Sequence, residues 1–215
     1  MSNFLFVTPT RGDIRAETTV CVDRCREQCG ELIPWERILG GALMTLQLDY
    51  CMAAFIKDHT EDYVVMLGSD HTFSPNDIAK LLQAAIEGRD VVDSLNVRAS
   101  GKICCNPYGG ELLVDGSVVE VINTGLGISV ISRKILLQMI DVLNLQEYGA
   151  SGSITVWPFF QQAYDPDDPA KSYKGADYSF CNRVREAGGK VYVHTGVQPG
   201  HMKMKQMKFN KETYV

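Results

Sequence analysis

A run of strand-forming side chains, Tyr63–Leu67 (YVVML), stops abruptly at Gly68. A strand that is apolar at both odd and even positions has both faces covered, which is typical of the centre of a sheet with helices on its two sides. Ser74 and Pro75 then begin a helical pattern, because Ser is a favourable N-cap and Pro suits the first turn. The run therefore predicts a strand followed by a helix, the repeating unit of an α/β domain.

The same alternation of short apolar runs and helical patterns extends along most of the chain. Strands are predicted at residues 3–7, 63–67, 90–95, 128–131 and 191–193, and helices at residues 14–29, 41–57, 74–87, 132–145 and 177–187. Residues 101–122 have hairpin spacing, with strands at 102–105, 111–114 and 118–122. The order predicts a Rossmann-like α/β fold with a mixed central sheet and helices on both faces.

Length and composition fit one globular domain. The chain has 215 residues, of which 45% are hydrophobic and 22% charged, so we expect a single domain over residues 1–215. No apolar run approaches the roughly 20 residues that cross a bilayer. The start of the chain lacks the basic segment of a signal peptide. We therefore expect a cytoplasmic protein without a membrane span, whose oligomeric state the sequence leaves open.

The charge of the chain argues against nucleic acid as a partner. The net charge is −5, whereas contact with a phosphate backbone needs concentrated Lys and Arg. One basic cluster occupies the C-terminal tail at residues 203–215, and it contains Lys203, Lys205, Lys208 and Lys211. Such a tail either meets a phosphate or is simply solvated.

The cysteines indicate packing more than chemistry. There are seven, an odd number, and disulfides are not expected in a cytoplasmic chain. Cys21, Cys25 and Cys29 fall on one stripe of a helix. Small apolar side chains facing the core explain this stripe more simply than a metal cluster does.

Polar residues gather where the predicted strands end. Residues 8–12 follow the first strand, residues 68–71 follow the central strand, and residues 195–201 follow the last one. In open α/β sheets, ligands bind at the carboxyl ends of the strands. These three segments are therefore the predicted location of a binding site.

A few side chains near these strand ends are suited to chemistry. Asp70 offers a carboxylate and His201 an imidazole, and both groups bind divalent metals. The role of His71 stays open, because it neighbours Asp70. Asp177 stands beside Gly175 at the start of a helix. It either accepts a proton from an acceptor hydroxyl or caps its helix, and the two roles are compatible.

Four segments together resemble a bacterial and phage branch of the GT-A glycosyltransferases. They are Met66–Phe73 (MLGSDHTF), Asn123–Gly127 (NTGLG), Gly175–Cys181 (GADYSFC) and Gly200-His201. The resemblance extends from Phe4 to His201. It implies the GT-A fold of nucleotide-diphospho-sugar transferases. It also implies a hexosyltransferase-like enzyme that moves a sugar from a nucleotide-diphosphate sugar to a hydroxyl acceptor.

The resemblance also implies roles for individual residues. Asp70 and His201 would hold Mn²⁺ or Mg²⁺, and Asp177 would be the catalytic base of an inverting enzyme. The loop at residues 146–174 would close over the donor. The nucleotide sugar would contact Thr8, Pro9, Thr10, Arg11, Asp49, Ser69, Asp70 and Gly125.

Two positions depart from the family pattern. Gly68 stands where the family has the first Asp of its Asp-x-Asp motif, and Ala176 stands where it has Glu. These changes keep a non-catalytic nucleotide-sugar binding protein open as an alternative. Two further alternatives remain. One is a nucleotidyltransferase, which only Arg11-Gly12 indicates. The other is a phage-type DNA-base glycosyltransferase, which the acidic net charge disfavours. The sugar, the nucleotide, the acceptor and the stereochemical outcome are not set by the sequence.

Overall fold

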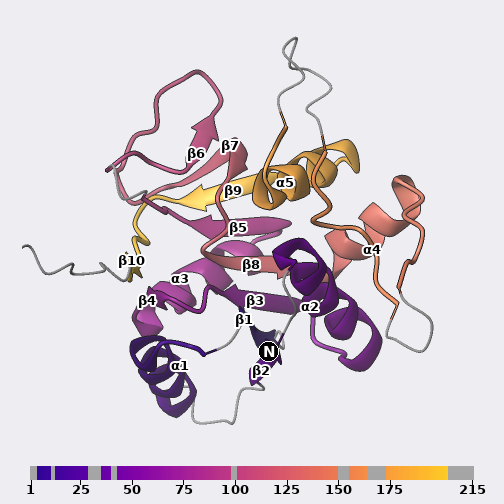
Figure 1. Cartoon of the computed structure of the whole chain (residues 1–215). Helices are drawn as coiled ribbons and strands as arrows, with labels where there is room; N and C mark the ends of the chain where they lie inside the picture. Colours follow the sequence, from indigo (N-terminus) through magenta and orange to yellow (C-terminus); the bar gives the residue numbers. More distant parts are fainter. Residues whose placement is uncertain are drawn as a thin grey trace, which may run out of the picture.

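The structure, a computed structural model, describes residues 4–10, 13–28, 35–39, 43–97, 101–149, 155–163 and 173–202. These residues form an eight-stranded sheet in the order β2-β1-β3-β8-β5-β9-β7-β6 (Figure 1). Its strands are β1 (Phe4–Thr10), β2 (Trp35–Leu39), β3 (Tyr63–Leu67), β5 (Val91–Ser94), β6 (Cys105–Pro107), β7 (Val118–Thr124), β8 (Ile128–Ser132) and β9 (Val191–His194). A separate two-stranded sheet pairs β4 (His71–Thr72) with β10 (Gly200–His201).

The large sheet is mixed, as predicted. Strand β1 pairs in parallel with β2 and β3, and β5 pairs in parallel with β9. Strand β8 lies between β3 and β5 and is antiparallel to both. Strand β3 occupies the predicted residues, and its last four side chains are buried because helices cover both faces of the sheet.

Five helices of the described chain cover the two faces. They are α1 (Ala16–Gln28), α2 (Met44–Asp58), α3 (Pro75–Ile86), α4 (Arg133–Val142) and α5 (Ala176–Glu186). Helices α2, α4 and α5 pack on one face, and α1 and α3 pack on the other (Figure 1). This arrangement of layers is the predicted one. No helix within the described ranges combines the length and the apolar character that a membrane span requires.

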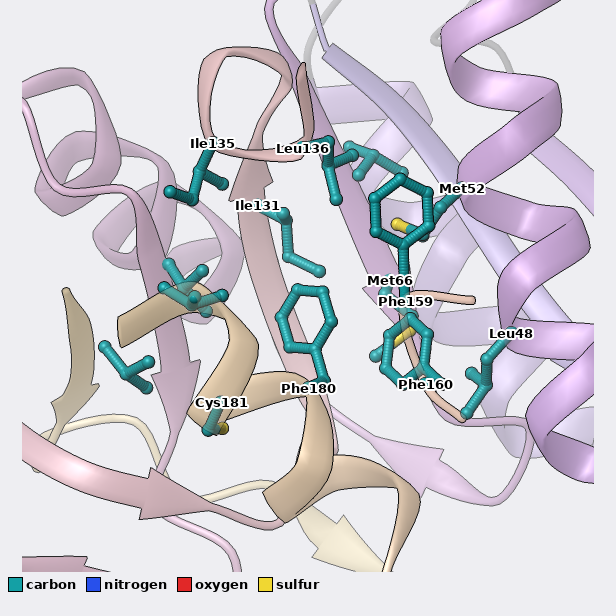
Figure 2. Packing of buried hydrophobic residues seen from close by; sticks show 14 of the residues in the cluster. Leu48, Met52, Met66, Ile131, Ile135, Leu136, Phe159, Phe160, Phe180 and Cys181 are labelled. Carbon is teal, nitrogen blue, oxygen red and sulfur yellow. The ribbon is translucent and has the colours of Figure 1, made fainter. Parts of the chain in front are cut away.

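Large side chains fill the space under α2, α4 and α5. The rings of Phe160 and Phe180 stack with their centroids 4.5 Å apart. They pack with Ile131 and Met66 between the helices and the sheet (Figure 2). Burying each such side chain contributes roughly 1.5–3 kcal/mol. Because Phe180 belongs to the first turns of α5, its burial fixes the position of the start of that helix.

The predicted helix signals are confirmed where they are strongest. Ser74 and Asp77 form a reciprocal capping box at the start of α3, with Pro75 as the first helical residue. Gly88 follows the end of α3 with a φ of +98°, a conformation that only glycine adopts without strain. Ser132 caps α4 through its side chain, which accepts a hydrogen bond from the amide of Ile135.

The predicted hairpin is wrong in its middle strand, and its first strand, predicted at 102–105, lies instead at Cys105–Pro107. Residues 111–114 form no strand, and Leu113 is 72% exposed. The partner of β7 is instead β6, with a register irregularity between Asn106 and Pro107. Strand β2 was not predicted because Glu36 and Arg37 interrupt its apolar pattern. Strands β4 and β10, which pair with each other, are too short to be predicted from a sequence pattern.

The cysteine stripe is confirmed where the structure describes it. Cys21 and Cys25 are buried on the face of α1 that packs against the sheet and α3. Cys29 and the basic tail at residues 203–215 lie outside the described residues.

One arginine closes the carboxyl end of α2, and this gives a first prediction. The Arg133 guanidinium donates hydrogen bonds to the carbonyls of Phe55, Ile56, His59 and Glu61 at 2.7–3.2 Å. The last carbonyls of a helix lack partners within the helix. We expect Arg133→Met to lower the free energy of unfolding by about 2–3 kcal/mol, because hydrogen bonds from a charged donor are lost.

Urea denaturation of Arg133→Met measures this loss, and Lys134→Met is the matched control. The Lys134 side chain is 79% exposed and lies 4.0 Å from Asp90, at the limit of an ion pair. The control should therefore change stability by less than about 0.5 kcal/mol. Equal stabilities of the two variants would contradict the capping role.

Candidate metal and acceptor site

Three potential metal ligands converge beyond the carboxyl end of β3. Asp70 Oδ2 lies 3.0 Å from His201 Nε2, and Asp70 Oδ1 lies 3.1 Å from His71 Nδ1. The two imidazole rings stack with their centroids 4.6 Å apart. One ligand atom from each residue falls within 4.8 Å of the others. We call this group the Asp70–His71–His201 triad.

The backbone that carries the triad is held by α1 and by β10. The hydroxyl of Thr18 donates to the carbonyls of Ser69 and His71 at 3.2 and 2.7 Å. The amide of Arg15 also donates to the Ser69 carbonyl, at 3.0 Å. The amide of Met202 donates to the Asp70 carbonyl at 2.8 Å, next to the pairing of β4 with β10. Asp70 and His71 are thus presented by a fixed turn, and His201 is brought to them by the pairing of β10 with β4.

The triad is suited to a divalent cation. His71 is 8% exposed, and its buried Nδ1 lies 3.1 Å from Asp70 Oδ1 without good hydrogen-bond geometry. A buried polar atom that is poorly paired is costly, and a cation would give this nitrogen a better partner. Desolvation lowers the pKa of His71 below its ordinary value, which favours the neutral ring that coordinates metals. One carboxylate and two imidazoles form a donor set common to transition-metal sites.

Asp177 lies at the start of α5. The N-cap of this helix is Gly175, which makes no side-chain cap, and Asp177 is the second helical residue. The alternative that Asp177 caps the helix is therefore wrong. Within the described part of the chain no donor binds its carboxylate. Burial alone raises its pKa to about 6. A partly buried carboxyl with such a pKa is suited to accept a proton near neutral pH.

Gly125 lies against Asp177. The amide of Gly125 donates to the Cys104 carbonyl at 2.7 Å. A β-carbon on Gly125 would come within 3.2 Å of the Cys104 side chain and 3.9 Å of Asp177 Oδ2. The glycine therefore allows three segments of the chain to approach closely beside the Asp177 carboxylate.

A buried carboxylate supports the segment Thr124–Gly127, which connects β7 to β8. Asp93 is fully buried and accepts hydrogen bonds from four groups. The donors are the hydroxyls of Thr124 and Ser129, the amide of Gly127 and the side chain of Asn96, at 2.8–3.3 Å. Desolvation raises the pKa of Asp93 to about 7.

The supported segment links both halves of the site. The carbonyl of Gly125 accepts from Asn96 at 2.7 Å, on the side of Asp177. The carbonyl of Gly127 accepts from the amide of Gly68 at 2.9 Å, on the side of the triad. Asp93 and Asn96 were missed in the sequence. The signal that could have revealed Asp93 is a charge inside the apolar run at residues 91–95.

The nucleotide contacts expected at the end of β1 differ in accessibility. Thr8 is fully buried and its hydroxyl accepts from the indole of Trp35 at 3.0 Å. Pro9 and Thr10 are also buried. Arg11 lies outside the described residues. The last side chains of β1 therefore present little surface that a nucleotide could contact.

Asp49 has a structural setting that does not fit a direct nucleotide contact. It is fully buried, and its two oxygens accept from the Tyr148 hydroxyl and the Phe160 amide, each at 2.7 Å. Desolvation raises its pKa to about 6. Its carboxylate thus anchors the irregular segment after α4 to helix α2.

The same segment is anchored a second time by Lys57. Its ammonium group donates to Glu147 at 3.0 Å and to the carbonyl and hydroxyl of Thr155 at 2.8 and 2.9 Å. The expected loop at residues 146–174 is therefore held against α2 at residues 147–148 and 155–160. Residues 150–154 and 164–172 lie outside the description.

Comparison with known proteins identifies the fold. No protein-family model and no curated protein sequence matches the chain. Among solved structures, A197 from STIV superposes with a TM-score of 0.59 at 17% identity, over 94% of this chain and 86% of A197. GalNAc-T7, solved with UDP, GalNAc and Mn²⁺, superposes with a TM-score of 0.54 at 11% identity.

The match to GalNAc-T7 covers the whole of this chain but only 40% of GalNAc-T7. At these identities the likeness shows the fold alone. The chain has the mixed α/β fold of the GT-A glycosyltransferases, as the sequence predicted.

Proposed function

We propose that the protein transfers a sugar from a nucleotide-diphosphate sugar to a hydroxyl acceptor, with a divalent cation held by the triad. The observation that carries this proposal is the meeting of Asp70, His71 and His201 at 3.0–3.1 Å beyond β3. Ligands of open α/β sheets bind at this edge. The GT-A fold supports the same reaction class.

The residues of the chain divide the chemistry between two places. A divalent cation bound by the triad would neutralise charge on the departing diphosphate. Asp177, partly buried and with a pKa raised to about 6, would accept the proton of the acceptor hydroxyl. Gly125 would keep the segment Thr124–Gly127 packed closely beside that carboxylate. Ser69, whose carbonyl is bound to α1, would fix the turn that faces the diphosphate.

Binding of a nucleoside diphosphate is the first test of this proposal. We expect UDP or GDP with Mn²⁺ to raise the melting temperature by about 5 °C or more, since ligand at 100 times its dissociation constant adds about 2.7 kcal/mol of stability. Either component alone should give a smaller shift, because binding of metal and of nucleotide is coupled reciprocally. Differential scanning fluorimetry measures these shifts.

His201→Ala is the informative variant for this experiment, and His194→Ala is its control. His194 is only partly buried and belongs to β9, outside the triad. The control should retain the full shift and His201→Ala should lose most of it. Failure of every nucleoside diphosphate to bind in the presence of Mn²⁺ would refute the proposal.

Turnover separates the enzyme from the other candidates. Release of the nucleoside diphosphate from a sugar nucleotide, with transfer to a hydroxyl acceptor, would support the enzyme. Tight binding of sugar nucleotides without transfer or hydrolysis would favour the non-catalytic binding protein. Release of pyrophosphate from a nucleoside triphosphate would favour a nucleotidyltransferase, and transfer to DNA bases would favour the phage-type alternative.

A further inference from the structure

We infer that Asp49 is a positioning residue for the proposed reaction, because it holds residues 159–163, which in turn hold the start of α5 and its Asp177 carboxylate in place. We call residues 159–163 the bridging segment. Asp49 belongs to α2 and Asp177 to α5, so the effect of one on the other would pass through this segment. The inference rests on the proposed function in one respect, namely that Asp177 accepts the proton of the acceptor hydroxyl.

The first support is the carboxylate that ties the bridging segment to α2. Asp49 is fully buried, and its Oδ1 accepts a hydrogen bond from the Phe160 amide at 2.7 Å. Its Oδ2 accepts from the Tyr148 hydroxyl, also at 2.7 Å. Hydrogen bonds to an ionised acceptor are shorter and stronger than those between neutral groups. The bridging segment is therefore fixed to α2 at Phe160.

The second support is the contact of the bridging segment with α5. The rings of Phe160 and Phe180 stack with an interplanar angle of 9°, and both are fully buried (Figure 2). Phe180 follows Asp177 by three residues, which is close to one turn of the helix. The residue that Asp49 holds by its amide thus packs its ring against the turn that carries Asp177.

The third support is a set of hydrogen bonds on either side of the stacked rings. The amide of Ala163 donates to Ser179 Oγ at 3.2 Å, and the carbonyl of Ala163 accepts from the Lys174 amide at 3.1 Å. The guanidinium of Arg183 donates to the Phe159 carbonyl at 3.2 Å. The bridging segment thus contacts the chain just before α5, in its first turn and in its second turn.

The start of α5 needs such a restraint. Its N-cap, Gly175, makes no side-chain hydrogen bond to the helix. Helix ends are among the parts of a protein that open most easily. A displacement of about 1 Å in a reacting group can lower a rate about 100-fold. The bridging segment therefore replaces the missing cap and keeps Asp177 at one distance from its substrate.

The experiment measures kcat and the KM of the donor for release of nucleoside diphosphate, with the sugar nucleotide that wild type turns over. Asp49→Ala removes both hydrogen bonds, so kcat should fall about 10–100-fold while the donor KM stays within about 3-fold of wild type. Asp49→Asn should keep kcat within about 3-fold, because its carbonyl can accept from the Phe160 amide and its NH₂ can donate to the Tyr148 oxygen.

Tyr148→Phe is the matched control on the same carboxylate. It removes the hydrogen bond to Oδ2 and leaves Phe160 held through Oδ1. Its melting temperature should fall, because a buried oxygen loses its donor, but its kcat should equal that of wild type. A purely structural Asp49 would instead lower the melting temperature in both Asp49→Ala and Tyr148→Phe and kcat in neither.

Phe180→Leu interrupts the same path at its other end and keeps the inference testable if Asp49→Ala fails to fold. Loss of the ring stack should lower kcat about 10-fold or more, again with little change in the donor KM. Where both single variants fold, the double variant should lose less than the product of the two single losses, because both act on one path.

Amide hydrogen exchange gives a readout that needs no substrate. In Asp49→Ala or Phe180→Leu, the Ser179 amide, which donates to the Gly175 carbonyl, should exchange at least about 10-fold faster than in wild type. The Ala187 amide, which donates to the Arg183 carbonyl at the other end of α5, is the internal control. Its exchange rate should stay within about 2-fold of wild type.

The outcomes separate this inference from the proposed function. Wild-type kcat in folded Asp49→Ala or Phe180→Leu would overturn the inference, as would an equal loss of kcat in Asp49→Ala and Tyr148→Phe, and the proposed function would stand in both cases. A wild type that turns over no sugar nucleotide would refute the proposed function. The exchange rates would then decide alone: faster exchange confined to the start of α5 supports the hold by Asp49, and unchanged exchange overturns it.

Discussion

Asp177→Asn should lower the rate of sugar transfer by about 10²–10⁴-fold while leaving the affinity for the sugar nucleotide nearly unchanged. The substitution keeps the size of the side chain but removes the ability to accept a proton. The structure strengthens this expectation because Asp177 makes no helix cap whose loss would disturb α5. Single-turnover rates and donor titrations of the same protein preparation measure the two quantities separately.

The pH dependence of the rate provides an independent readout of the same carboxyl. Burial raises the pKa of Asp177 to about 6. A base acts in its ionised form, so the rate should fall as the pH drops through about 6 and reach a plateau above it. The residual activity of Asp177→Asn should lack this acidic limb.

Glu186→Gln provides the matched control at the other end of α5. It makes the same change of carboxyl to amide on an exposed side chain, and its rate and pH profile should equal those of wild type. If Asp177→Asn keeps most of its turnover, the proton acceptor is another group or the reaction needs none.

Asp93→Asn should have the largest effect on stability, lowering the free energy of unfolding by about 2–4 kcal/mol. One oxygen of Asp93 accepts from the Gly127 amide and the other from Asn96. In Asp93→Asn, the side-chain NH₂ group would replace one of these oxygens, and a donor would then face a donor. Asn96 cannot turn around to accept, because its nitrogen also donates to the carbonyl of Gly125 at 2.7 Å.

The effect of Asp93→Asn should depend on pH. The pKa of Asp93 rises from 3.8 to about 7 on folding, so between these values the folded protein binds more protons than the unfolded chain. Through this group, stability falls as the pH rises across that window. The variant should lack this contribution. The difference in the free energy of unfolding between wild type and Asp93→Asn should therefore be larger at pH 4 than at pH 8.

Chemical denaturation at the two pH values measures both effects, with Asp141→Asn as the control. Asp141 is exposed near the end of α4, and its substitution should change stability by less than about 0.5 kcal/mol. A stability of Asp93→Asn equal to that of the control would mean that the four hydrogen bonds of Asp93 do not support the fold.

Local sequence signals correctly predicted the strands and helices that are stabilised by interactions between residues close in the sequence. Strand β3 and helix α3 lie where the apolar run and the Ser74 cap placed them. The missed strands depend on distant partners. Strand β2 contains charged residues, and it forms because it pairs with β1. The pattern at residues 111–114 suggested that they would pair with β7, but β6 pairs with β7 instead.

The candidate site could be predicted only in part, because its residues come together through contacts between distant segments. The family resemblance singled out Asp70, His201 and Asp177, but only the pairing of β4 with β10 brings the first two within 3.0 Å. His71 stayed undecided because a sequence does not tell in which direction a side chain points from a turn. Asp49 looked like a ligand contact because helical periodicity alone cannot show that Tyr148 and Phe160 cover it.

The pairing of β4 with β10 has a consequence for the order of events during synthesis. His71 and Asp70 are translated early, whereas His201 follows Asp70 by 131 positions. A nascent chain can complete most of its large sheet while its triad still lacks one imidazole. The cation proposed for the triad would therefore find all three of its protein ligands only after β10 has paired with β4.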